Sequence, residues 1–199
     1  MKLSRQLFSL AFVVCVGVQC AAQKIETNIS WLTTIPDAAN NISYSPAQKL
    51  TIDDFKGTPN SATDAVAITA SGFMFNAAFH SVNGKATLAI TVYFSFNKNE
   101  SWMKEKGRNA YILSHEQRHF DISYLSTLQF IKKLKQAKFT QDDYMDQLKE
   151  IYKEVAASMR EMQHQYDEET HNGINTAKQN EWDTKIAGKL SVAAAEKIL

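Results

Sequence analysis

The stretch His115-Glu116-Gln117-Arg118-His119 follows the pattern H-E-x-x-H and lies in a segment with helical periodicity. Residues four apart lie on the same face of an α-helix, so both imidazoles can reach one metal ion. Glu116 lies one position round from His115, at the edge of that face, where it can hold a metal-bound water. Two histidine ligands and a glutamate that acts as general base are the arrangement found in zinc metalloproteases.

The residues around the motif favour a metal site over a chance match. With five histidines in the chain, the pattern arises by chance in on the order of one chain in a hundred. Leu113 and Phe120 flank it and predict a helix that packs in the core, where polar side chains need a function. Asp121 falls on the side of this helix away from the metal, so we expect it to be a buried, hydrogen-bonded residue.

The N-terminal half of the chain has the pattern of β-strands. Short strand-like pieces lie around Ile25–Trp31, and β-forming residues dominate from Ala65 to Phe96. Asn83-Gly84 is a hairpin turn signal, and Thr87–Phe96 after it is the strongest strand pattern. This half therefore predicts a mostly antiparallel sheet.

The C-terminal half predicts three helices. The first runs from about Gly107 to Ala137 and carries the H-E-x-x-H motif. Thr140 is the expected N-cap of a second helix that ends near Glu169, and Asn172-Gly173 is a stop signal after it. Apolar residues at helical spacing then predict a third helix. Residues 23–199 are thus expected to form one α+β domain, with the three helices on one side of the sheet.

The first 22 residues predict a secretory signal peptide. Lys2 and Arg5 give a positive start, an apolar run follows over 7–18, and Cys20-Ala21-Ala22 offers small residues for cleavage. The run is too short to span a bilayer comfortably. Acylation of Cys20, as in a lipoprotein, ranks second because Gln19 stands where a small residue is expected. We therefore expect an exported protein, periplasmic or secreted, with no stable membrane span in the mature chain.

Charge and cysteine content exclude several other classes. The formal net charge is +1 and there is no basic stripe, so we expect no nucleic-acid partner. Cys15 and Cys20 both lie in the leader, which leaves the mature chain without cysteine. This excludes a cysteine protease and a cysteine-ligated zinc site, and the fold must be held by its core or by a core plus a metal.

A catalytic zinc site takes three protein ligands and keeps a fourth position open for water. The metzincin spacing would put a third histidine six residues after His119, but that position is Leu125. The stretch 166–171 near the end of the second helix supplies other candidates. We favour His171, with Asp167 one helical turn earlier as an orienting partner or as the ligand itself. Alternatively, His171 is a helix-end histidine that interacts with the helix dipole.

The chain resembles a bacterial family, domain-of-unknown-function family 922, described as predicted secreted zinc-dependent proteases of the zincin-like clan. The similar positions lie within about residues 30–185. Two positions depart from the family pattern: Ile52 replaces a tryptophan, and the family histidine falls at Asn172, so that Asp167 and Glu169 stay candidates beside His171. The motifs are L-T-x-x-D-F-x-G-x-P at 50–59, A-x-T-x-S-G at 67–72, W…L-x-H-E-Q-x-H-F-D-I at 102–122, and the set Tyr166, Asp167, Glu169, Thr170, Asn175, Gln179 and Trp182.

Together the residues and the resemblance predict a zincin-like zinc metallopeptidase, a hydrolase with one Zn²⁺ per chain. His115, His119 and His171 are the expected metal ligands, and Glu116 is the expected general base. Tyr166 is the expected oxyanion donor.

The expected substrate is a peptide or protein. If the strand Thr87–Phe96 is the sheet edge beside the first helix, it would bind an extended substrate by strand addition. The alternative is a non-catalytic binding or structural module of the envelope on a zincin fold, with a structural zinc or none. The small size of the chain favours this alternative slightly, because it leaves little material for a second wall of a cleft.

Overall fold

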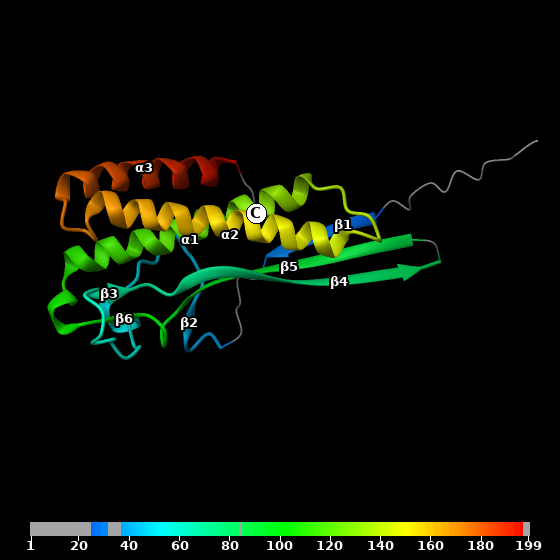
Figure 1. Cartoon of the computed structure of the whole chain (residues 1–199). Helices are drawn as coiled ribbons and strands as arrows, with labels where there is room; N and C mark the ends of the chain where they lie inside the picture. The colour runs from blue at the N-terminus through cyan, green and yellow to red at the C-terminus, as the bar shows by residue number, and fades with distance from the viewer. Residues whose placement is uncertain (1–24, 32–36, 84, 197–199) are drawn as a thin grey trace, which may run out of the picture.

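The computed structural model describes residues 25–31, 37–83 and 85–196 (Figure 1). The expected signal peptide, Cys20 and the second residue of the Asn83-Gly84 turn lie outside these ranges. Strands come first and three long helices follow, which confirms the expected α+β organisation. The elements are β1 (Ile25–Trp31), β2 (Asn41–Ile42), a 3₁₀ turn (Ile52–Asp54), β3 (Ala67–Ile68), β4 (Ser71–Val82), β5 (Lys85–Asn97), β6 (Trp102–Met103), a 3₁₀ turn (Glu105–Gly107), α1 (Ala110–Gln136), α2 (Tyr144–Thr170) and α3 (Thr176–Ala195).

Strand β5 is the centre of the main sheet. Every second side chain from Ala86 to Phe96 is buried, as the sequence alternation predicts. β4 pairs with β5 in antiparallel register along its whole length. On the other edge, β1 pairs with β5 in parallel register, and β2 pairs antiparallel near the end of β5. Strand addition to Thr87–Phe96 is conditional on its lying at the sheet edge, and this condition is not met, because β1 and β2 cover the second edge of β5.

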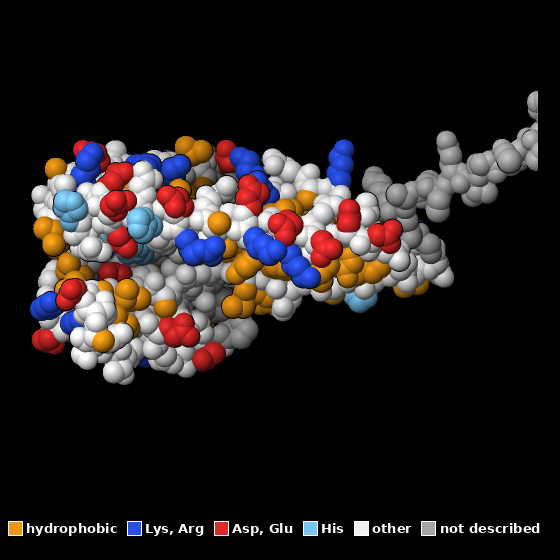
Figure 2. Space-filling model, in the orientation of Figure 1, with side chains coloured by type: hydrophobic (Ala, Val, Ile, Leu, Met, Phe, Trp, Pro, Cys, Tyr) orange, Lys and Arg blue, Asp and Glu red, His pale blue; other side chains and the backbone are white. Residues whose placement is uncertain are grey.

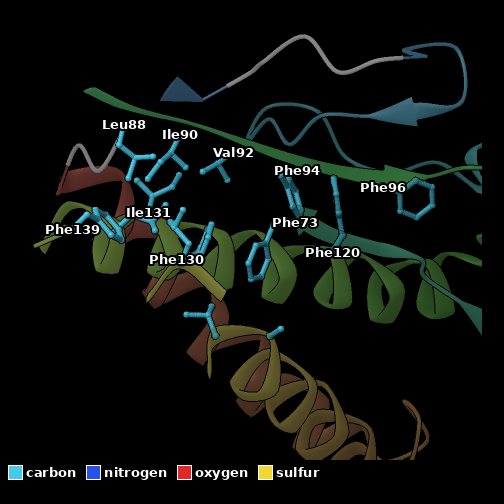
Figure 3. Packing of buried hydrophobic residues seen from close by; sticks show 14 of the residues in the cluster. Phe73, Leu88, Ile90, Val92, Phe94, Phe96, Phe120, Phe130, Ile131 and Phe139 are labelled. Atoms are coloured by element: carbon cyan, nitrogen blue, oxygen red, sulfur yellow. The ribbon is translucent and has the colours of Figure 1, made fainter. Parts of the chain in front are cut away.

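The inward face of β5 packs against α1 through both aliphatic and aromatic side chains (Figure 3). Phe94 stacks on Phe120 of α1 with ring centroids 5.3 Å apart. Further along, Phe130 of α1 lies 5.1 Å from Phe73 of β4 and 6.0 Å from Tyr152 of α2, measured between centroids. Full burial of each phenylalanine contributes about 1.5–3 kcal/mol. These rings fix the position of α1 on the sheet.

Helix α1 lies between the sheet and the other two helices (Figure 1). It contacts β1, β4 and β5 on one side and α2 and α3 on the other. Its first turn is capped by Asn109, whose side chain accepts hydrogen bonds from the backbone N–H groups of Tyr111 and Ile112. All three helices lie on one side of the sheet, as expected, and α1 is buried over most of its surface.

The ends of α2 differ in part from the expected ones. Thr140 is not its N-cap: its backbone N–H and Oγ1 both donate to Asp143 Oδ1, at 3.0 and 2.6 Å, and form a turn before the helix begins. At the other end, His171 adopts the left-handed conformation with a φ of 50° and ends the helix. The predicted stop at Asn172-Gly173 is confirmed, since both residues have positive φ.

No helix in the described ranges is long and apolar enough to cross a membrane. A second, two-stranded sheet pairs β3 with β6 beside the N-terminal half of α1. This small sheet and the helices lie on opposite sides of the candidate site.

Replacing Phe130 with alanine should lower the free energy of unfolding by about 3–5 kcal/mol, because its ring is fully buried among aromatic side chains of β4 and α2. Met74→Ala is the control, since Met74 is 64% exposed on β4; it should cost less than about 0.5 kcal/mol. Urea unfolding followed by circular dichroism measures both. Equal losses would contradict the proposed packing of α1 on the sheet.

Candidate functional site

A cavity of about 300 Å³ opens beside the N-terminal half of α1. We call it the histidine cavity because His115 and His119 line it. Its walls come from α1, from α2 and from the segment 65–71, which contains β3. Figure 2 shows this face hollowed between the helices and the lobe that contains β3 and β6.

The two histidines of α1 meet at the cavity, as their spacing predicts. The Nε2 atoms of His115 and His119 lie 3.2 Å apart, and both side chains are largely buried. Ligand atoms of His115, Glu116 and His119 all lie within 4.8 Å of one another, a grouping that can hold a metal ion. The one-turn spacing on a helix is the cause of this convergence.

Asp167 of α2 completes the group from the opposite wall. Its Oδ1 lies 3.2 Å from His115 Nε2 and 2.9 Å from His119 Nε2. Three ligands at about 2.0–2.1 Å from a tetrahedral ion are about 3.3 Å from one another. The three atoms therefore have the spacing that one metal ion requires.

Glutamine amides hold both imidazoles in the orientation that a metal needs. His115 Nδ1 lies 3.0 Å from Gln179 Oε1 of α3, and His119 Nδ1 contacts Gln163 Oε1 of α2. Amide oxygens accept hydrogen bonds, so each Nδ1 donates its proton to a glutamine and each Nε2 faces the cavity. Such partners set the tautomer and the ring orientation of metal-ligating histidines.

Glu116 lies beside the two histidines, and a hydrogen bond fixes its carboxylate. Its side chain is 4% exposed and lines the cavity. Thr69, which follows β3, donates from Oγ1 to Glu116 Oε2 at 2.7 Å. The carboxylate therefore has a fixed position next to the histidines, where it can accept a proton from a bound water.

The charges of the site shift the pKa values of Asp167 and His119. Burial alone would raise the pKa of Asp167, but hydrogen bonds and attraction from His115 and His119 lower it well below its usual range. Burial alone would lower the pKa of His119, but Asp167 and the nearby Glu116 raise it. The carboxylate and the imidazole thus favour each other's charged forms.

His171 does not face the two other histidines. It is exposed at the end of α2, and the side chains that line the histidine cavity do not include it. Its left-handed backbone takes the chain off the helical face that carries Asp167. Glu169 is turned toward α3, where it accepts a hydrogen bond from Trp182 Nε1 at 2.9 Å. Of the candidates for the third ligand, the structure brings Asp167 to the site.

Tyr166 lies behind His115 rather than in the cavity. Its ring stacks on the imidazole at 4.6 Å and is fully buried. Its hydroxyl donates to the backbone carbonyl of His115 at 3.3 Å and accepts from Gln179 Nε2 at 2.7 Å. Tyr166, the expected oxyanion donor, therefore supports the ring that it touches, and it is not among the residues that line the histidine cavity.

Asp121 is buried and hydrogen-bonded, as predicted. Its carboxylate accepts from Tyr44 Oη at 3.0 Å, from Gln117 Nε2 at 2.8 Å and from Arg118 at 2.9 Å. Arg118 also donates to Asp183 of α3 at 2.8 Å. This network ties the far side of the motif helix to the N-terminal segment and to α3.

Gln163, Gln179 and Thr69 were missed as members of the site. One signal existed for Gln163, which precedes Asp167 by four residues and so shares its face of α2. Thr69 and Gln179 both stand in the family motifs quoted above, but no local pattern assigns them to the site, because their roles depend on how β3 and α3 pack against α1.

A family model described as "Bacterial protein of unknown function (DUF922)" matches residues 95–173. The matched segment runs from the end of β5 to the turn after α2 and includes His115, Glu116, His119 and Asp167. The match supports a relationship to this family. No curated protein and no solved structure matches the chain at a significant level.

Asp167→Asn should destabilise chelator-treated protein by about 1 kcal/mol at pH 5.5, and by less at pH 8.5. A carboxylate whose pKa is lowered by folding stabilises the fold above about pH 4. This stabilisation is lost as the pH falls through the pKa that the carboxylate has in the folded protein. An imidazole whose pKa is raised by folding stabilises the fold below about pH 6.5. This stabilisation is lost as the pH rises through the pKa that the imidazole has in the folded protein. The pair therefore contributes most between these limits.

Urea unfolding at the two pH values measures this difference. The matched control is Glu168→Gln, whose carboxylate is exposed and lies 3.8 Å from the exposed imidazole of His164. This control should have little effect at either pH. An equal loss of stability at both pH values for Asp167→Asn would contradict the charge pairing.

Proposed function

We propose that this chain is a zinc-dependent peptidase with a zincin-like fold. The observation that carries the proposal is the convergence of His115 Nε2, His119 Nε2 and Asp167 Oδ1 on one point in the wall of an open cavity. Glu116 stands beside them, held by Thr69. Two imidazoles, one carboxylate and a free neighbouring glutamate form the donor set of a hydrolytic zinc site.

The donor set fits zinc in number and kind. Zinc in hydrolases is bound by three nitrogen or oxygen ligands and keeps one position open. His115, His119 and Asp167 would hold it, and Gln163 and Gln179 would keep the imidazoles oriented. When bound, zinc acts as a Lewis acid that polarises a carbonyl group and lowers the pKa of a coordinated water.

Glu116 would carry the proton in this reaction. Its carboxylate takes a proton from the attacking water and transfers it to the leaving nitrogen of the peptide. The Thr69 hydroxyl fixes one carboxylate oxygen by its 2.7 Å hydrogen bond and also contacts the Glu116 carbonyl at 3.3 Å. The general base is thereby aligned before substrate binds.

The segment 65–69 is the substrate-binding wall in this proposal, in place of Thr87–Phe96. Residues of this segment, including Ala67 and Ile68 of β3, line the histidine cavity opposite α1. Within the described ranges, β3 pairs with β6 alone. An extended peptide can run beside such a strand and form main-chain hydrogen bonds to it.

The openness of the site favours catalysis over a purely structural metal. Structural zinc sites are closed by four protein ligands, whereas catalytic sites keep a position for water. Here the ligand atoms line a cavity, and the Asp167 side chain is 38% exposed. We also propose export of the chain through the leader 1–22, on the evidence of its sequence.

Metal analysis of purified residues 23–199, expressed with zinc supplied, tests the ligand set. Wild type and His171→Ala should each contain about one zinc per chain, whereas His119→Ala and Asp167→Ala should lose it. Inductively coupled plasma mass spectrometry measures the content and separates zinc from iron. Zinc retained by Asp167→Ala but lost from His171→Ala would move the third ligand to His171.

Glu116→Gln should keep zinc but lower peptide hydrolysis by about 10²–10⁴-fold, because the amide cannot accept the proton from water. The exposed Glu168→Gln is the control and should hydrolyse peptides at the wild-type rate. Release of fluorescence from a quenched peptide library measures turnover. Wild-type turnover by Glu116→Gln would refute the general-base role, and a zinc-loaded wild type without turnover would favour the non-catalytic module.

A further inference from the structure

A second cavity of about 580 Å³ adjoins the histidine cavity. We call it the side pocket. The two cavities share Ala65, Val66, Ile112 and Asn172 in their walls, so they are parts of one continuous depression. Consider a peptide that lies along the segment 65–69 with its reacting bond at His115 and His119. A side chain next to that bond would then lie at the side pocket.

The side pocket is bordered by hydrophobic side chains that are exposed to solvent. Ile174, in the turn between α2 and α3, is 81% exposed, and Tyr111, in the first turn of α1, is 41% exposed. Ile68, which is 43% exposed, lines the histidine cavity beside it. Exposed large hydrophobic residues are few in the described part of the chain, and their concentration around one depression marks a binding surface.

The wall that carries Ile174 is held in place relative to the histidines. Tyr111 donates a hydrogen bond from its hydroxyl to the carbonyl of Gly173. Gly173 has a φ of 85°, and a Cβ atom there would lie 3.3 Å from His115 Nδ1. The turn therefore packs directly against a proposed metal ligand, and the distance from the pocket to the reacting bond is fixed by the fold.

Charges at the side pocket do not favour a charged ligand of either sign. Asp64 and Lys106 both line it and carry opposite charges, and its other polar side chains, Thr63, Asn109 and Asn172, are neutral. The remaining walls are apolar or aromatic: Ala65, Val66, Tyr111, Ile112 and Ile174. A cavity of this size admits any single amino-acid side chain. The pocket therefore suits a large uncharged, apolar group.

We propose that the side pocket binds a large apolar side chain, such as leucine, methionine or phenylalanine, of a residue adjacent to the cleaved peptide bond. This inference rests on the proposed peptidase function and specifies its substrate class. Burial of such a side chain against Val66, Tyr111 and Ile174 would supply binding energy close to the reacting bond.

Cleavage of a peptide library by zinc-loaded wild type tests the preference. Peptides of alanine and glycine with one variable position should be cut next to leucine, methionine or phenylalanine at least tenfold faster than next to alanine or aspartate. Mass spectrometry locates the cut. Cleavage with no preference for a large apolar neighbour would overturn the inference but leave the peptidase function standing.

Ile174→Asp should lower kcat/KM for the leucine peptide at least tenfold more than it lowers kcat/KM for the alanine peptide. The control is Val192→Asp, because Val192 is 58% exposed on α3 and does not line either cavity. The control should match wild type on both peptides. Equal losses on both peptides for Ile174→Asp would contradict a side-chain pocket.

Binding to the zinc-loaded Glu116→Gln variant tests the pocket without turnover. Methyl NMR with the leucine peptide should shift the signals of Val66, Ile112 and Ile174, and the alanine peptide should bind at least tenfold more weakly. Shifts at these methyl groups without any cleavage by wild type would support the pocket and refute the peptidase function. Equal affinity for both peptides, or shifts confined to other methyl groups, would refute the pocket.

Discussion

The contact of the Asp167 carboxylate with two imidazoles of α1 is the constraint on which the arrangement of the helices depends. One carboxylate oxygen lies 2.9 and 3.2 Å from the two Nε2 atoms. Charged and polar groups that are partly withdrawn from water need partners of complementary charge. α1 supplies two members of this group and α2 supplies the third. The crossing of the two helices is therefore fixed by a polar contact as well as by apolar packing.

The division of α1 into two halves explains how a core helix can carry this group. Its C-terminal half packs through apolar side chains such as Phe130 and Ile131. In its N-terminal half, Gln117 and Asp121 are buried, and their polar atoms are hydrogen-bonded. Within the described residues, no buried side-chain nitrogen or oxygen lacks a hydrogen-bond partner. The sheet therefore anchors the helix along one face, through Phe120 as well as Phe130, and the polar network of the N-terminal half leaves His115 and His119 to line the cavity.

The sequence predicted the features that depend on residues close together in the chain. It did not predict the features that depend on how distant elements pack. Helical spacing alone brings His115 and His119 together, and alternation alone identifies the buried face of β5. The third member of the site depends on where α2 ends, and a single left-handed residue at His171 separates that side chain from the face of Asp167. Likewise, alternation cannot reveal which strands flank β5, because β1 returns to it from a distant part of the chain.

The groups that contact the imidazoles determine the net charge of the site, and therefore the charge of the ion that would balance it. Gln163 and Gln179 orient the rings as neutral amides, so they fix the tautomers without adding negative charge. Asp167 and Glu116 then supply a formal charge of −2 beside two imidazoles that are neutral when they act as ligands. A divalent cation neutralises this charge in full. The raised pKa of His119 reflects the same demand for positive charge, since Asp167 and Glu116 favour its protonated form. The histidine cavity is therefore electrostatically suited to a divalent metal, independently of the geometric fit of its ligands.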